Sequence, residues 1–357
     1  MQIKLKTEEL KQAVNKVVKG MGNNKYLPIT EMIGLNINDS ILSFVTTDDS
    51  CKVQVDLPIE GNTENMAFVV NGKTFSQLIQ KTTTEFVTLT ADSNKLTLKG
   101  NGTYSFSFSL DEEKELVKIN PIVVDKTNVE EISIKELKKT YDINKSSLSE
   151  TTDTPEYTGF YFDENGSLTT NSIKISYIKN KIFSSPILLN SKFVSLVSLF
   201  DTDKAVSYQT NSDIVIESGN VKIESYKMTE VSEFPVESIK PFLEDELPHK
   251  IRLNKKALLN LLDRISVFVS PFDKNSIKIE FTQDGAKIWT LNGVNNELLP
   301  YTDKDNFVES SIKVDVKNLK DLVGADPEEE LVIMYGHPSA IKLSFDNVSQ
   351  VLALAGD

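Results

Sequence analysis

The sequence contains few of the residues from which metal sites and many active sites are built. Among its 357 residues there is one cysteine, Cys51, and there are two histidines, His249 and His337. A single cysteine forms no internal disulfide, which favours a reducing cytoplasm. With so few Cys and His side chains, we expect neither a Cys/His metal centre nor a His-based catalytic site.

Other signatures are absent as well. No apolar run approaches the ~20 residues that span a bilayer, and the opening MQIKLKTEELKQAV lacks the apolar core of a secretion signal. There is no Walker loop, GxGxxG fingerprint or GxSxG elbow, and the GNG at 100–102 has the composition of a hairpin turn. The sequence therefore predicts a noncatalytic cytoplasmic protein that has no cofactor and no membrane partner.

What the sequence does contain is one pattern repeated along its whole length. A short strand followed by a helix is expected near residues 2, 131 and 249, in QIKLKTEELKQAVNKVVKG, EEISIKELKKTYDINK and HKIRLNKKALLNLLDR. A second such opening follows about 60 residues after each, in MAFVVNGKTFSQLIQK, SPILLNSKFVSLVSLF and IKVDVKNLKDLVG. Alternating apolar residues, typical of half-buried strands, come after the openings. The sequence therefore predicts an α+β protein of six strand–helix–strands units, paired into three domains at 1–124, 125–247 and 248–357.

Positive charge is concentrated in the six expected helices. Their segments, 7–19, 71–81, 133–145, 190–199, 254–264 and 315–323, carry a net charge of +8 in a chain of net charge −13, so the remainder carries −21. Lysine is also common on ordinary solvated helices, which is the alternative explanation for any one helix. If the six helices share one side, that side is basic and suits the phosphate backbone of duplex DNA, bound without regard to sequence. No zinc-finger spacing, basic zipper or RNP motif indicates a sequence-specific reader.

In this layout the sequence resembles the bacterial β-type DNA sliding clamps, the processivity subunit of the replicative DNA polymerase. The resemblance covers the whole chain, and its most specific segments are YLPITEMIGLNI (26–37), EFP (233–235) and the closing VLAL (351–354). The divergence and slightly short length are more like a phage-encoded or otherwise diverged clamp than a chromosomal one. The resemblance implies three copies of the DNA-clamp domain, forming half of a six-domain ring that closes as a head-to-tail homodimer. Such a ring encircles double-stranded DNA and tethers the replicative DNA polymerase, and a clamp loader places it there.

The resemblance also implies which cations face the DNA. Scattered lysines suit sliding, because lysine is a flexible and strongly hydrated point charge. An ordinary solvated lysine is the alternative at each position. The implied residues are Lys11, Lys16, Lys25, Lys73, Lys138, Lys139, Lys192, Lys255, Lys256, Arg264, Lys317 and Lys320.

Clamps of this family bind short linear peptides of polymerases and the clamp loader in an apolar pocket that includes the C-terminal tail. The residues implied here are Thr170, Ser172, Ile173, Lys174, Ile175, Pro235, Ile239, Lys240, Val351, Leu352, Ala353 and Leu354. Ser172, Ile173 and Lys174 replace the Gly-His-Arg of the family, so a different peptide motif is expected. The alternative for the tail is a plain edge strand.

The resemblance places the dimer interface at YSFSFSL (104–110), which alternates Tyr104, Phe106 and Phe108 with serines. An apolar edge strand of this kind needs a cover. Phe268 and Val269 are the implied residues on the other side of the interface. The alternative is that these aromatic side chains close the core of their own domain.

Two other functional classes remain open at this stage. One is a noncatalytic β-rich structural or interaction protein that does not encircle DNA. The other is a hydrolase with an unrecognised site, against which the shortage of His and Cys argues.

Overall fold

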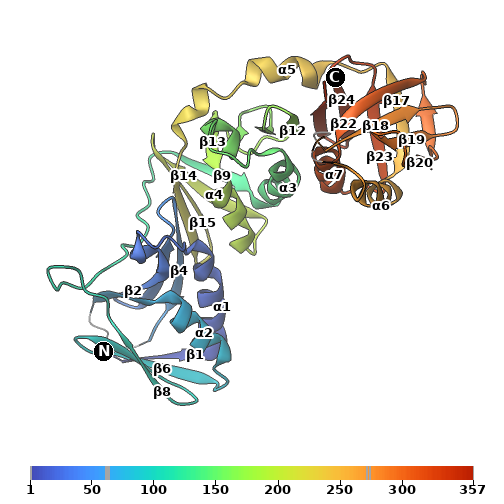
Figure 1. Cartoon of the computed structure of the whole chain (residues 1–357). Helices are drawn as coiled ribbons and strands as arrows, with labels where there is room; N and C mark the ends of the chain where they lie inside the picture. The colour runs from blue at the N-terminus through green and yellow to red at the C-terminus, as the bar shows by residue number, and fades with distance from the viewer. Residues whose placement is uncertain (1, 61–64, 271, 273–274, 357) are drawn as a thin grey trace. The chain divides into compact units, whose positions relative to one another are not determined.

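The computed structural model describes residues 2–60, 65–270, 272 and 275–356 (Figure 1). These residues form seven α-helices: α1 Thr7–Val17, α2 Gly72–Lys81, α3 Ile134–Asn144, α4 Ser191–Leu196, α5 Val236–Glu244, α6 Lys255–Ser266 and α7 Val316–Ala325. Short 3-10 helices are η1 Val18–Gly20, η2 Pro28–Glu31, η3 Lys145–Ser147, η4 Pro155–Thr158, η5 Val197–Leu199 and η6 Thr229–Ser232.

The chain divides into two compact units. The first consists of residues 1–135 and 192–227, and the second of residues 136–191 and 228–357. The predicted second domain, 125–247, therefore contributes to both units. The division into three domains at 124/125 and 247/248 stays a prediction.

The first unit contains two antiparallel sheets, with strand orders β1-β6-β7-β8 and β5-β2-β3-β4-β16-β15-β14-β9. Their strands are β1 Gln2–Lys6, β2 Met32–Asn38, β3 Ile41–Thr47, β4 Cys51–Pro58, β5 Met66–Asn71, β6 Phe86–Ala91, β7 Lys95–Lys99, β8 Thr103–Ser107, β9 Val129–Ser133, β14 Lys204–Gln209, β15 Asp213–Ser218 and β16 Val221–Tyr226.

The second unit also contains two antiparallel sheets, with orders β13-β10-β11-β12-β25-β24-β23-β17-β21 and β20-β19-β18-β22. Their strands are β10 Gly159–Phe162, β11 Ser167–Thr170, β12 Lys174–Ile178, β13 Ile187–Asn190, β17 His249–Asn254, β18 Ser276–Phe281, β19 Ala286–Thr290, β20 Asn296–Leu299, β21 Asp303–Asp305, β22 Ser310–Asp315, β23 Glu330–Tyr335, β24 Ala340–Phe345 and β25 Val348–Ala353.

The predicted strand–helix–strands pattern is confirmed along the chain. A strand leads directly into α1, α2, α3, α4, α6 and α7. Three strands follow each of these helices before the next opening strand, except that α6 is followed by four, β18 to β21. The opening strand of one copy pairs with the sheet of the next: β1 pairs with β6, whereas β5 pairs with β2. The same exchange joins β9 to β14 and β13 to β10, and then β17 to β23 and β22 to β18. Two consecutive copies therefore complete each other's sheets.

Local sequence explains where the helices begin and which face they bury. In α6 the side chain of Asn254 accepts a hydrogen bond from the N–H of Ala257, which satisfies an unpaired donor of the first turn. Leu258, Leu261, Leu262 and Ile265 recur at helical spacing and are all buried. They belong to a core shared with α7 and the strands around it.

The helix α3 rests on its sheet through polar groups. The Thr140 Oγ1 and Ser167 Oγ atoms are 3.1 Å apart, and the Thr169 hydroxyl donates to the carbonyl of Asn144 at 2.7 Å. A third pair, Ser147 and Ser176, is separated by 2.7 Å, and all these side chains are buried. Because these buried hydroxyl groups find partners, a serine- and threonine-rich layer is tolerated beneath the helix.

Two of the aromatic residues predicted at the dimer interface lie in the core of the first unit. Phe106 packs edge-on against Phe75 with ring centroids 5.4 Å apart, and Phe108 stacks on Phe68 at 4.1 Å. Both are less than 9 % exposed, whereas Tyr104 is 40 % exposed. Their side chains therefore follow the alternative interpretation, closure of the unit's own core, because facing aromatic rings already cover them.

We expect Phe108→Ala to destabilise the first unit by about 3–5 kcal/mol, because it removes a buried ring from a stacked pair. Tyr104→Ala is the matched control and costs about 0.5 kcal/mol, since that side chain is exposed. Urea unfolding followed by circular dichroism measures both. A Phe108→Ala protein of normal stability that had lost self-association would instead place this ring at the interface.

Candidate nucleic-acid interface

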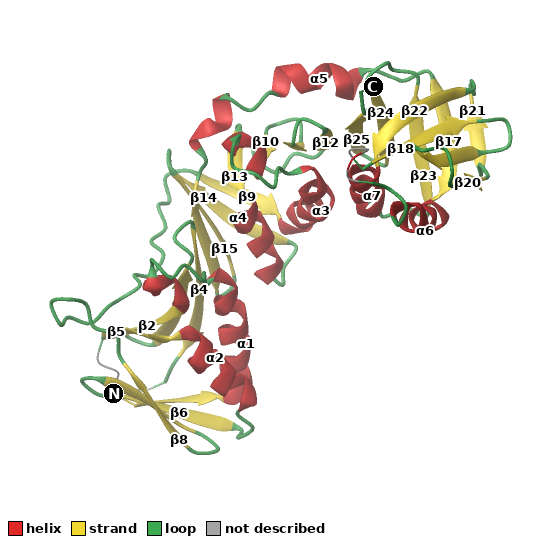
Figure 2. Cartoon of the chain, viewed as in Figure 1, coloured by secondary structure: helices red, strands yellow, loops and turns green. Residues whose placement is uncertain are grey.

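The helices of each unit pack against one another. In the first unit α1 contacts α2, and in the second unit α7 contacts both α6 and η3 (Figure 2). The helices α1 and α2 also pack on strands of the eight-stranded sheet. Cations on neighbouring helices can therefore contribute to a shared surface within each unit.

Five helices carry a lysine at the same place, their second residue. These lysines are Lys73 in α2, Lys135 in α3, Lys192 in α4, Lys256 in α6 and Lys317 in α7. In α2, α6 and α7 the residue two places earlier is an Asn or Asp whose side chain caps the helix. The cap fixes the first turn, so the following lysine leaves each helix in an equivalent direction.

Lys135 is the member of this set that was not predicted. The spacing Asn/Asp/Ser-x-Lys, at 71–73, 133–135, 190–192, 254–256 and 315–317, is the sequence signal that identifies it. Its side chain is exposed, as are those of Lys73 and Lys256. Lys25, in the loop after η1, is exposed too, and within the described part of the chain none of these four lysines forms an ion pair.

Other predicted DNA-facing cations are paired with carboxylates inside their own unit. The nitrogen–oxygen distances are 2.5 Å for Lys16–Asp201, 3.0 Å for Lys139–Asp346, 2.5 Å for Lys320–Asp263, 3.0 Å for Lys317–Glu150 and 2.6 Å for Arg264–Glu297. Lys11, Lys138 and Lys192 are half-buried. The predicted set is therefore chemically divided into paired and unpaired cations.

The paired carboxylates are held in their charged form. The hydrogen bond from Lys139 holds the pKa of Asp346 below its usual value, and Lys317 lowers the pKa of Glu150 in the same way. Arg264 donates through Nε and Nη2 to the two oxygens of Glu297 and lowers the pKa of that carboxyl. These side chains are therefore anionic throughout the neutral range.

Lys255 contacts the end of a neighbouring helix. It lies in the first turn of α6, where the helix dipole disfavours a cation. Its Nζ donates at 2.5 Å to the carbonyl of Asp326, the residue that ends α7. The side chain is half-buried and compensates the negative end of the neighbouring helix, so this nitrogen already has a protein partner. That Lys255 faces DNA stays a prediction.

The residues of the predicted peptide pocket come together in the second unit. Strand β12 pairs with β25, which places Lys174 opposite Leu352 and Ile175 opposite Val351. Pro235 caps α5, which carries Ile239 and Lys240 and contacts β25. Strand pairing thus unites segments about 180 residues apart in the sequence.

The side chains, however, do not form an open apolar pocket. Val351, Leu352, Thr170 and Ile239 are each less than 9 % exposed. Ser172 occupies a left-handed turn conformation with a φ of 70°, and Ile175, Ala353 and Leu354 are half-buried. Ile173 is exposed, and so is Lys240. The tail is an interior strand of a nine-stranded sheet, so the edge-strand alternative is wrong for Val351 and Leu352. Their assignment to the peptide pocket stays a prediction, and in this structure both side chains are buried.

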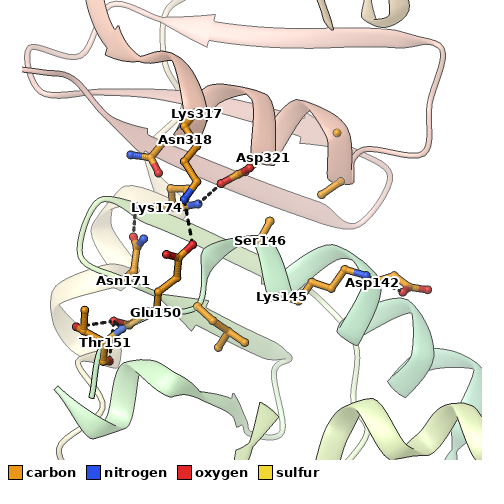
Figure 3. A pocket seen from close by; sticks show the side chains of 14 residues that line it. Asp142, Lys145, Ser146, Glu150, Thr151, Asn171, Lys174, Lys317, Asn318 and Asp321 are labelled. Carbon is orange, nitrogen blue, oxygen red and sulfur yellow. Dashed lines mark hydrogen bonds and ion pairs between the residues drawn. The ribbon is translucent and has the colours of Figure 1, made fainter. Parts of the chain in front are cut away.

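One pocket of this unit is lined mainly by polar and charged side chains (Figure 3). It has a volume of about 780 Å³ and lies among α3, the 145–151 segment, the β11–β12 turn and α7. Lys174 points to Asp321 at 2.8 Å, and Lys317 points to Glu150 at 3.0 Å, so two ion pairs join opposite sides of this pocket. The buried side chain of Lys174 thus forms one of the two ion pairs that bridge this pocket.

A second hollow of about 590 Å³ lies between α5 and strands β10–β12. Tyr161, Leu168, Tyr177 and Leu243 supply apolar surface, and Lys240 lies at its rim with several carboxylates. Burial and the charge of Asp163 raise the pKa values of both tyrosines, so their hydroxyls are neutral donors. Of the two hollows, this one offers more apolar lining to a bound side chain.

Phe268 and Val269 follow α6 at the surface of the second unit. Phe268 is 58 % exposed, Val269 is half-buried, and the adjacent Val267 is 78 % exposed. Consecutive exposed apolar residues are typical of an interaction surface. They remain candidates for the predicted dimer interface, together with Tyr104.

The described residues contain neither a membrane-spanning helix nor a cluster of metal ligands. None of their helices is both long and apolar enough to span a bilayer. Over the same ranges, no three or more His, Cys, Asp and Glu side chains are grouped so that they could bind a metal ion. Cys51 is buried.

Comparison with known proteins agrees with the sequence resemblance. Residues 1–116 match the sequence model of the DNA polymerase III beta subunit, N-terminal domain. No curated protein sequence matches the chain significantly.

Solved structures extend the likeness over the whole chain. The DNA polymerase sliding clamp of Bacillus subtilis is 16% identical, with a TM-score of 0.85 over 100% of this chain and 99% of that one. The beta subunit from DNA polymerase of Streptococcus pyogenes is 15% identical, with a TM-score of 0.87 and full coverage of both chains. The sliding clamp of Pseudomonas aeruginosa is 15% identical, with a TM-score of 0.83 and full coverage of both. The chain has the sliding-clamp fold, and the resemblance to a diverged bacterial β clamp is confirmed.

Two adjacent lysines, Lys255 and Lys256, allow a matched test of the contact at the end of α7. We expect Lys255→Met to lower the free energy of unfolding by about 1–3 kcal/mol, because it removes a charged donor from a helix end. Lys256→Met changes the charge equally and costs about 0.5 kcal/mol or less, since its side chain is exposed. Thermal denaturation measures both. Equal losses would contradict the assignment of Lys255 to the end of α7.

Proposed function

We propose that this protein is a DNA sliding clamp, a noncatalytic processivity factor that encircles duplex DNA and tethers a replicative DNA polymerase. The observation that carries the proposal is the sliding-clamp fold over the entire chain, joined to the family match of residues 1–116. The buried Cys51 is compatible with a reducing cytoplasm, where replication takes place.

The exposed lysines support binding to the DNA backbone. Lys73, Lys135 and Lys256 project from equivalent positions on three helices, and Lys25 lies on an exposed loop. Single lysines spaced along helices attract phosphates without reading bases. Contacts of this kind are weak and exchange with water, which is the property that a sliding protein requires.

Ring closure by a second copy is part of the proposal. A head-to-tail contact must close, because an open one would produce filaments. The exposed apolar residues Val267, Phe268 and Tyr104 are candidates for this contact. The expected assembly has about twice the 39.9 kDa mass of the chain.

Partner binding is proposed on the second unit. Ile173 and Leu354 belong to neighbouring segments, since the Ala353 N–H donates to the carbonyl of Ile173. Lys240 on α5 borders the apolar hollow at the other end of β12, near Tyr177. Peptides of a polymerase or a clamp loader would insert an apolar anchor there, with a motif different from that of the family's typical pocket.

Topological binding is the direct test of the function. We expect the protein to remain on nicked circular duplex DNA in gel filtration after loading by a clamp loader of matching origin. Cutting the circle should release it, because a ring slides off free ends. A structural protein that does not encircle DNA would show no retention, and retention that survives cutting would indicate ordinary binding.

The helix-start lysines provide a second test. Replacing Lys73, Lys135 and Lys256 by Ala should reduce the slope of log K against log salt by up to about 2.7, because each lost phosphate contact contributes ~0.9. Fluorescence anisotropy with a short duplex measures the slope. The matched control replaces Lys95, Lys99 and Lys118, which lie on strands or loops and change the net charge equally. A slope reduced equally by both variants would show that only net charge matters.

A further inference from the structure

Most cations of the candidate interface fall into two groups that differ in position along the helices. Lys317 is the exception, because it lies at the second residue of α7 and is nevertheless paired with Glu150. Unpaired lysines lie at the second residue of α2, α3 and α6: Lys73, Lys135 and Lys256. Lysines further along a helix, Lys16 in α1, Lys139 in α3 and Lys320 in α7, are each bound to a carboxylate.

In each of these pairs the carboxylate is the outer partner. The side chain of Asp201 is 81% exposed and that of Lys16 25%. For Asp346 and Lys139 the values are 68% and 31%, and for Asp263 and Lys320 they are 62% and 33%. A phosphate that approaches any of these lysines therefore meets a negative charge first.

The carboxylates come from three unrelated places in the fold. Asp201 follows η5, Asp263 lies on α6, and Asp346 occupies the turn between β24 and β25. Each forms one ion pair with a helix lysine. The same arrangement, built three times from different elements, provides the lysines with internal counterions.

From this arrangement we infer that Asp201, Asp263 and Asp346 set the strength of DNA binding by occupying the mid-helix lysines, which leaves the lysines at the helix starts to contact phosphates. The inference rests on the proposed sliding-clamp function. A phosphate can take a paired lysine only by displacing its aspartate, which then remains beside the DNA as a repelling charge. The exchange creates no net ion pair, so the paired lysines add little affinity, and the protein holds DNA loosely enough to move along it.

The test replaces the three aspartates by asparagine. Asp201→Asn, Asp263→Asn and Asp346→Asn preserve side-chain shape, and asparagine tolerates the positive φ of 47° at position 346. Exposed ion pairs contribute little to stability, so the variant is expected to fold. The matched control, Glu112→Gln with Glu164→Gln and Glu233→Gln, changes the net charge equally at exposed loop positions.

We expect the asparagine variant to bind a short duplex about tenfold or more tightly than the wild type at 0.1 M salt. Its slope of log K against log salt should steepen by up to about 2.7, because three cations become free to bind phosphates. The control should tighten binding less and steepen the slope by about 1 or less. Diffusion of the loaded variant along DNA, followed by single-molecule fluorescence, should be slower than that of the control.

A second set of variants tests the inference by replacing lysines instead of aspartates. Replacing Lys16, Lys139 and Lys320 by Ala should weaken duplex binding far less than replacing Lys73, Lys135 and Lys256. Comparable losses from the two lysine sets would overturn the inference, because paired lysines would then be contacting phosphates.

The outcomes separate this inference from the function on which it rests. If the wild type is retained on circular DNA and the asparagine variant matches its control, the inference fails and the sliding-clamp function stands. If the wild type is not retained and does not bind the duplex, both fail. Retention together with a steeper slope for the asparagine variant alone supports both.

Discussion

Hydrogen bonding between the opening strand of one copy and the sheet of the neighbouring copy is the constraint on which the rest of the structure depends. Strand β5 leads into α2, but its backbone is paired with β2, which belongs to the preceding copy. Strand β22 leads into α7 and is paired with β18 in the same way. A helix that begins at the end of a paired strand has a fixed start and direction. The capping residue then fixes its first turn, and the lysine two places later acquires a defined position.

The backbone fixes where these lysines lie, and neighbouring charged groups then determine what each lysine can bind. An acidic chain must collect cations where it contacts DNA, yet a dense cluster of free lysines would bind phosphates too strongly for movement. Lys139 and Lys320 show how the fold moderates this charge, since each lies beneath a more exposed carboxylate. Lys255 shows a third use of a cation, the compensation of a neighbouring helix end. Lysines of similar helices thus differ in their role, which is decided by the group that lies opposite each of them.

The repeat and the helix starts could be predicted from the sequence because they depend on local signals. Asn254 and the leucines after it indicate a cap and a buried face without reference to any distant residue. The partners of Lys16 and Lys139 could not be predicted, since Asp201 and Asp346 are 185 and 207 positions away. The aromatic residues after Tyr104 present the same difficulty. Their alternation indicates an apolar face, but only the fold shows that Phe68 and Phe75 already cover it.

The C-terminal tail shows how strand pairing constrains the chemical role of a predicted site residue. The resemblance places Val351 and Leu352 beside Lys174 and Ile175, and the register of β12 with β25 joins these segments. Because β24 flanks β25 on the other side, the strand lies inside the sheet, and its apolar side chains serve the core. A peptide can then reach only the ends of this strand, near Ile173 and Leu354. Where the family's pocket would be apolar, Lys174 contributes a buried ion pair with Asp321. The partner surface that we propose therefore lies next to the strand rather than on its buried side chains.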